Sequence, residues 1–72
     1  MPMNVTYEVI FVSQQENGNY DVFVNGRKNL EAKDIGYQPA IDRAKTVLNN
    51  MGGGYVIVEY LDKEPELINC YK

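Results

Sequence analysis

The residue types that most often carry out catalysis are scarce in this 72-residue sequence. Histidine, the commonest general acid or base and a frequent metal ligand, does not occur. Ser13 is the only serine, and no base lies near it along the chain to activate its hydroxyl. Cys70, the only cysteine, follows an acidic stretch, whereas a reactive thiolate needs cationic surroundings. We therefore expect no enzymatic activity, no metal site and no cofactor.

Tyrosines and acidic residues are the side chains with which this sequence could bind a partner. There are six tyrosines and no tryptophan, and tyrosine is favoured at interfaces because it combines apolar area with a polar tip. Acidic residues gather around a turn near the C-terminus, where they would either attract a basic partner or protect an edge strand from pairing. The predicted protein-binding residues are Tyr55, Tyr60, Tyr71, Glu59, Asp62, Glu64 and Glu66.

Basic residues concentrate in the middle of the chain. Residues 27–45 hold five Lys or Arg against three Asp or Glu. Nucleic-acid binding is therefore the alternative, with an aromatic ring that could stack on bases beside the basic side chains. Its predicted residues are Arg27, Lys28, Lys33 and Tyr20. The net charge of −3 opposes this alternative, because nonspecific binding needs many cations to neutralise phosphates.

Strands and one helix are predicted to position these side chains. Runs rich in β-branched and aromatic residues predict strands over 4–13, 19–25 and 55–61, with shorter strands over 27–33 and 66–71. In the third strand, Lys28, Leu30 and Ala32 alternate with Arg27, Asn29, Glu31 and Lys33. Asn25-Gly26 is the expected centre of a tight hairpin turn, where both central residues need positive φ.

An amphipathic helix is predicted over residues 37–51. Its apolar stripe consists of Ala40, Ile41, Ala44, Val47, Leu48 and Met51. Pro39 stands in the first turn, where its missing N–H costs nothing, and the glycines from Gly52 onward end the helix.

The predicted class is α+β. We expect one domain over residues 1–72, in which one helix packs on a four- or five-stranded, mostly antiparallel sheet in the order β-β-β-α-β-β. A right-handed crossover would place the fourth strand beside the first and parallel to it, giving the sheet order 3-2-1-4-5. One helix leaves one sheet face open, and an apolar open face indicates an interface. We expect that face to hold Ile10, Val12 and Phe23, with either Tyr55 and Ile57 or Val56, Val58 and Tyr60.

The sequence also bears on where the chain resides. No segment reaches the roughly 20 apolar residues of a membrane helix. The first residues lack the basic and apolar regions of a signal peptide. The unpaired Cys70 agrees with a reducing compartment. We therefore expect a cytoplasmic protein that does not enter membranes.

The run from Asn19 to Tyr60 resembles a broad group of small β-β-α-β bacterial and phage domains. The shared features are Ala40 and Ala44 in the helix, the glycine turn Gly52 to Gly54, and the strand residues Val56 to Val58. This group includes phage-encoded inhibitors of host machinery, among them a small inhibitor of bacterial RNA polymerase. The resemblance implies that the chain blocks or modulates a partner, and it transfers no functional residue.

The expected function is therefore non-enzymatic protein binding to a partner with a basic surface, and the resemblance implies a phage-type inhibitor or modulator that docks on a host protein. Two alternatives stay open. One is a nucleic-acid-binding domain that uses the hairpin around Arg27 and Lys28. The other is a structural homodimer joined through the open sheet face.

Overall fold

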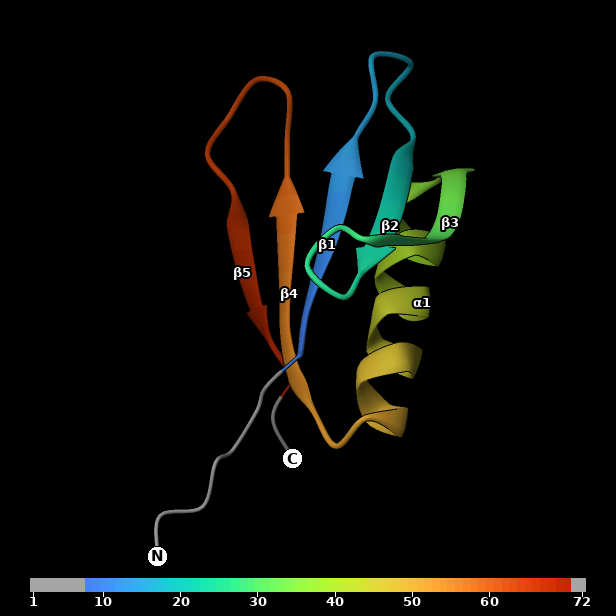
Figure 1. Ribbon diagram of the computed structural model, residues 1–72. Coiled ribbons are helices and arrows are strands. Elements are labelled where there is room, and N and C mark those ends of the chain that lie inside the picture. The colour runs from blue at the N-terminus through green and yellow to red at the C-terminus, as the bar shows by residue number, and fades with distance from the viewer. Residues whose placement is uncertain (1–7, 71–72) are drawn as a thin grey trace, which may run out of the picture.

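One helix packs on one face of a five-stranded sheet in the computed structural model, which describes residues 8–70 (Figure 1). The elements in chain order are β1 (Glu8–Gln14), β2 (Tyr20–Val24), β3 (Asn29–Ile35), α1 (Tyr37–Asn50), β4 (Gly54–Glu59) and β5 (Glu66–Asn69). The predicted α+β class is confirmed, and so is the fifth strand. Residues 4–7, predicted to begin the first strand, lie outside the described residues.

The strands are arranged in the predicted sheet order, β3-β2-β1-β4-β5. β4 runs parallel to β1, and the other neighbouring strands are antiparallel. The parallel pair arises because the chain crosses over through α1 between β3 and β4, which returns it in the direction of β1. This path leaves β3 and β5 as the two edges of the sheet.

The hydrophobic core lies between α1 and the sheet. Its buried members are Ile10, Val12, Tyr20, Val22, Ala40, Ile41, Ala44, Leu48, Val56 and Val58. Alanines on the helix allow it to approach the β-branched residues of the central strands closely. At the end of α1 the chain turns sharply into β4 at Gly54, which has a φ of +156°. A Cβ on Gly54 would lie 2.2 Å from the backbone oxygen of Glu8, so only glycine fits between β1 and α1 there.

The two faces of β1 are the reverse of the prediction. Ile10 and Val12 are fully buried under α1, although we expected them on the open face. Because successive side chains of a strand alternate between faces, Phe11 points to the open face instead. The prediction of Phe23 on that face agrees with its position directly opposite Phe11. Of the two alternatives for β4, the structure selects Tyr55 and Ile57, because Val56 and Val58 are buried.

Two irregularities in β3 break its predicted alternation. Leu30 lies opposite Phe23 and Ala32 lies opposite Val22, so two residues two positions apart face adjacent residues of β2. Such β-bulges move a strand's side chains from one face to the other. Leu30 therefore shares the open face with Phe23, whereas Ala32 packs against the core. The second irregularity coincides with Asp34, which has a φ of +58°.

The hairpin between β2 and β3 turns one residue later than predicted. The N–H of Lys28 donates to the carbonyl of Asn25 at 3.2 Å, so the central residues of the turn are Gly26 and Arg27, with φ values of 62° and 73°. Asn25 also has a positive φ of 54°. In Figure 1 this loop folds over the front of β1, on the side away from α1. The turn thereby brings Arg27 onto the open face.

Candidate protein-binding face

An apolar row crosses the open face of the sheet from one edge to the other. The strand registers place its five members directly opposite one another in the order Leu30, Phe23, Phe11, Ile57 and Leu67. We call these five residues the apolar row. Leu30 is 51% exposed and Leu67 is 64% exposed, and the three central members are half-buried. Tyr55, opposite Val9, adds apolar area beside the row.

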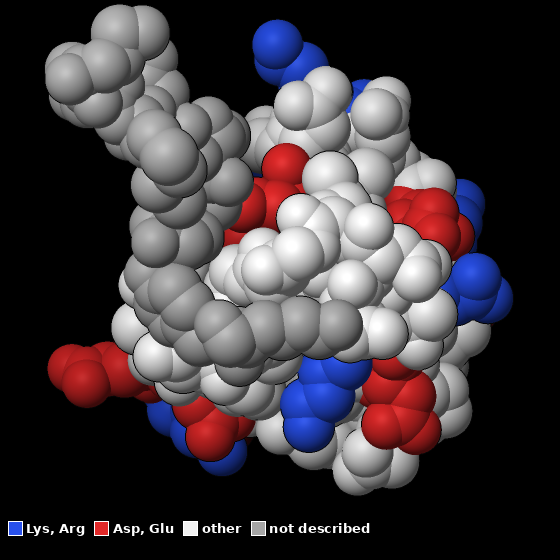
Figure 2. All heavy atoms as spheres, turned by 90° about the horizontal axis from the view of Figure 1, so that it is seen from below, with Lys and Arg blue, Asp and Glu red and all other residues white. Residues whose placement is uncertain are grey.

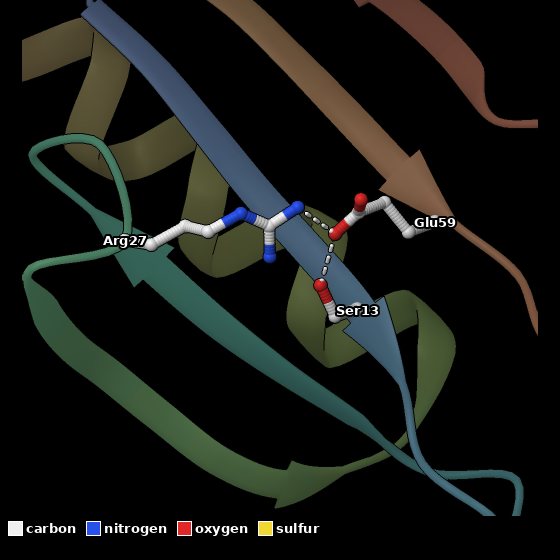
Figure 3. A network of polar contacts seen from close by, with 3 residues as sticks. All are labelled: Ser13, Arg27 and Glu59. Carbon is white, nitrogen blue, oxygen red and sulfur yellow. Dashed lines mark hydrogen bonds and ion pairs between the residues drawn. The ribbon is translucent and has the colours of Figure 1, made fainter.

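Arg27 extends from the β2–β3 hairpin across β1 toward Glu59 at the end of β4 (Figure 3). Its guanidinium carbon is 4.1 Å from the centre of the Phe11 ring, within the range of a cation–π contact. Its Nη2 is 2.5 Å from Oε1 of Glu59, and the same oxygen accepts a hydrogen bond of 2.6 Å from the hydroxyl of Ser13. Three elements, the β2–β3 hairpin, β1 and β4, are joined by this network.

The electrostatics of the network favour the ionised form of Glu59. The hydrogen bond from Arg27 lowers the pKa of Glu59, partial burial acts against it, and the hydrogen bond from Ser13 lowers the pKa further. A carboxylate whose pKa is held below its ordinary value is a weak general base. The geometry therefore suits a fixed ion pair that positions Arg27 better than it suits proton transfer from Ser13.

On the open face, the predicted acidic protein-binding surface and the predicted basic nucleic-acid-binding surface meet. Glu59 is a predicted protein-binding residue and Arg27 a predicted nucleic-acid-binding residue, and the structure pairs the two side chains. Arg27 consequently presents much of its charge to Glu59 and to an aromatic ring. The ion pair leaves the middle of the open face close to neutral.

Tyr60 and Tyr20 lie on the other side of the sheet. Tyr20 is 6% exposed and belongs to the core, so it does not present its ring for base stacking. Tyr60 packs against the core, with its ring centre 6.3 Å from that of Tyr20 and in edge-to-face geometry. The hydroxyl of Tyr60 donates a hydrogen bond to Glu66 at 2.9 Å. The ring centre of Tyr37 is 5.5 Å from that of Tyr20. Burial raises the pKa of both Tyr60 and Tyr20, so both phenols are neutral at physiological pH.

The remaining predicted protein-binding residues lie at the ends of β4 and β5. Tyr55 is half-buried on the open face. Asp62 and Glu64 are exposed in the turn between β4 and β5, and Glu66 is exposed at the start of β5. Tyr71 lies outside the described residues. The structure thus brings Tyr55 and Glu59 to the open face and leaves Asp62 and Glu64 in the turn at its corner. Tyr60 and Glu66 lie together on the side of α1.

The predicted basic residues do not gather into one patch. Lys28 is exposed in the β2–β3 turn. Lys33 lies nearer the other end of β2, where it lines a pocket of about 450 Å³ with Asp21, Asp34 and other polar residues. On the face shown in Figure 2, outside the grey atoms, Lys and Arg side chains are interspersed with Asp and Glu. This distribution gives little support to binding that depends on neutralising successive phosphates.

Sequence reasoning missed Phe11 and Ser13 as residues of the open face. The missed signal is residue size. A helix with Ala40 and Ala44 on its apolar stripe leaves room for small β-branched partners such as Val12, and a bulky Phe11 fits better as a cross-strand partner of Phe23. The hydrogen bond from Ser13 to Glu59 joins residues 46 positions apart in the sequence, so no local motif predicts it.

Comparison with other proteins and with known site types adds no assignment. Comparison with protein-family models, with curated proteins and with solved structures finds no match. The resemblance to small phage inhibitors accordingly stays a prediction. Within residues 8–70, no three His, Cys, Asp or Glu side chains are grouped so that they could hold a metal ion. In the same part of the chain, no helix has the length and apolar character to cross a membrane.

Proposed function

We propose that this protein is a non-enzymatic binding module that docks the open face of its sheet on another protein. The observation that supports this most is the apolar row, which extends across all five strands on the face opposite α1. Single exposed apolar residues are ordinary, but a contiguous apolar strip with charged surroundings is typical of interaction surfaces. The network of Arg27 and Glu59 fits such a surface, since arginine beside aromatic rings is common at interface centres.

The charges around the apolar row indicate the kind of partner. Glu59 is neutralised by Arg27, so the remaining negative charge near the row comes from the exposed β4–β5 turn, where Asp62 and Glu64 outnumber Lys63. Acids at the rim attract a basic surface and accelerate encounter. The proposed partner therefore has an apolar ridge that covers the row and Lys or Arg side chains that approach the β4–β5 turn.

A regulatory setting completes the proposal. The resemblance of the sequence to phage-encoded inhibitors favours a chain that acts in the cytoplasm by covering a surface of a host protein. A module of this kind needs no catalytic group. It needs a rigid face, and a sheet that is packed on its other side against α1 supplies one.

The test is a comparison of two lysine substitutions. Ile57→Lys places a charge in the middle of the apolar row, and Thr46→Lys places the same charge on the exposed side of α1. Each tagged variant and the wild type are used to capture proteins from a host-cell lysate. We expect a protein that the wild type and Thr46→Lys retain and that Ile57→Lys loses. If Ile57→Lys lowers the thermal midpoint, Ile57→Thr, which keeps the branched side chain, replaces it.

Surface-plasmon kinetics with the captured protein then separate the roles of single residues. Tyr55→Ala should speed dissociation, with a loss of about 2 kcal/mol if it is an anchor. Reversing Asp62 and Glu64 to lysine should slow association, and the deficit should shrink as salt screens the charges. Loss of binding in Lys28→Glu, with the acid reversals unaffected, would contradict the proposal and favour the basic hairpin as the functional surface.

A further inference from the structure

The two edges of the sheet differ in their readiness to pair with another strand. β3 carries two bulges, a residue of positive φ and the charges of Glu31, Lys33 and Asp34, all of which hinder strand addition. β5 pairs with β4 in an uninterrupted register over four residues and has one charged residue, Glu66. Leu67 on β5 is 64% exposed. The β5 edge thus lacks most of the features that protect the β3 edge.

Backbone hydrogen bonds determine which groups of β5 point outward. Cys70 donates its N–H to the carbonyl of Gly54 at 2.9 Å and accepts from the N–H of Gly54 at 3.4 Å. In an antiparallel pair, residues that exchange both bonds alternate with residues that point their N–H and C=O away from the neighbour. Counting back from Cys70, Leu67 points both backbone groups away from β4. Within residues 8–70, no strand lies on that side of β5.

The helix leaves space for a neighbour at this edge. Among the described elements, the backbone of α1 lies close to β1, β2, β3 and β4 but not to β5. Figure 1 shows β5 at the opposite side of the sheet from α1 and β3. A second sheet could therefore continue the first one past β5 without meeting a helix.

We propose that two copies of this chain pair through β5, antiparallel and about a twofold axis perpendicular to the sheet, with Leu67 opposite Leu67 of the second copy. This register satisfies the symmetry of a dimer, because the same residue meets itself on the axis. The outward N–H and C=O of Leu67 then exchange both hydrogen bonds with their copies. Facing residues share a sheet face, so the apolar row of one copy continues into the apolar row of the other.

Charge is compatible with this pairing. Glu66 and Ile68 are the neighbours of Leu67 on the two sides of the axis. The antiparallel register therefore places Glu66 opposite Ile68 of the second copy. No two like charges of β5 therefore face each other, which would have opposed self-association. A second copy supplies the matching hydrogen-bond groups, places Leu67 against Leu67 and brings no like charges of β5 together, and these features favour it as the occupant.

The size of the contact predicts a weak dimer. One short strand edge buries much less than the roughly 1,200–2,000 Å² of a stable interface. The test is sedimentation equilibrium over a concentration series from micromolar to millimolar. For the wild type we expect the average mass to rise from the monomer value of 8.2 kDa toward twice that value. Dimer formation by strand pairing should also slow hydrogen exchange of the Leu67 amide as concentration rises.

Two matched variants identify the surface. Leu67→Lys and Leu30→Lys change the two ends of the same apolar row, one on the regular edge and one on the bulged edge. Both leucines are exposed, so both variants should fold. We expect at least a tenfold weaker dimer for Leu67→Lys and unchanged association for Leu30→Lys.

Three results would overturn the proposal. A wild type that stays at the monomer mass at millimolar concentration would leave β5 open to an extended segment of another protein. Equal weakening by Leu30→Lys and Leu67→Lys would place the dimer contact on the open face. Association without slower exchange at Leu67 would exclude strand pairing. None of these results depends on the lysate-capture experiment with Ile57→Lys. The proposed dimer and the proposed function can therefore fail separately.

Discussion

Replacing Arg27 by alanine should destabilise the fold by an amount that depends on pH. The side chain makes an ion pair with Glu59 and a cation–π contact with Phe11. The Arg27 side chain is 45% exposed and that of Glu59 is 34% exposed, so the ion pair has the value of a surface pair, about 0.2–1 kcal/mol. The cation–π contact at an exposed site adds about 0.5–1 kcal/mol. At neutral pH the free energy of unfolding should therefore fall by about 0.7–2 kcal/mol.

The pH dependence separates these two contributions. The pKa of Glu59 is lower in the folded protein, chiefly through the hydrogen bond from Arg27. The ion pair therefore stabilises the fold above the ordinary glutamate pKa of about 4.3, and this stability is lost as pH falls through the folded pKa. Arginine stays protonated throughout, so the cation–π contact persists. The difference between wild type and Arg27→Ala should shrink in acid without vanishing.

The assay is urea unfolding followed by circular dichroism at neutral pH and at a pH below the folded pKa of Glu59. Arg27→Gly is the companion variant, because Arg27 has a φ of 73°. Glycine relieves the strain of a left-handed residue, about 1 kcal/mol, so Arg27→Gly should be more stable than Arg27→Ala by about that amount. A difference between wild type and Arg27→Ala that is the same at both pH values would refute the assigned role of the ion pair.

Three further predictions concern the core and the thiol. Leu48→Ala should cost about 2–5 kcal/mol, as for other fully buried leucines, whereas Thr46→Ala on the exposed side of α1 should stay within about 0.5 kcal/mol in the same urea experiment. Gly54→Ala should lower the free energy of unfolding by about 3 kcal/mol or more and can prevent folding, because its Cβ would overlap the backbone of Glu8. Gly52→Ala, with open space around the added Cβ, should cost about 1 kcal/mol. Equal thermal midpoints of the two variants would contradict the close approach of Gly54 to Glu8. Cys70→Ala should keep partner binding in the capture experiment, and loss of binding by a folded variant would revive a role for the thiol.

Much of the fold follows from local sequence patterns. The apolar stripe from Ala40 to Leu48 is buried in only one orientation of α1 on the sheet. The glycines after α1 allow the chain to turn back into the sheet over a few residues. A right-handed crossover through this helix places β4 beside β1, which is why the sheet order could be predicted. Bulges in β3 could not be predicted, because the alternation of Leu30 and Ala32 looks regular in sequence and the register comes from pairing with β2.

The candidate site was less predictable than the fold. Tyrosine count indicated binding, but Tyr20 and Tyr60 close one end of the core and so are not available as anchors. Apolar faces of a central strand look alike in sequence, since both Phe11 and Val12 could lie under a helix. Only packing against the alanines of α1 decides between them. The tyrosine count therefore did not indicate which residues form the apolar row on the open face.

The pairing of Arg27 with Glu59 follows from turn geometry and not from charge alone. An arginine within the β2–β3 turn could extend into solvent from either side of the hairpin. The positive φ values of Gly26 and Arg27 bend the loop toward the open face, and there Phe11 and Glu59 provide the two contacts that a guanidinium favours. These two contacts help to offset the strain of the left-handed backbone conformation at Arg27. Through them a residue outside regular secondary structure joins three elements of the face, which is why the hairpin belongs to the proposed binding surface.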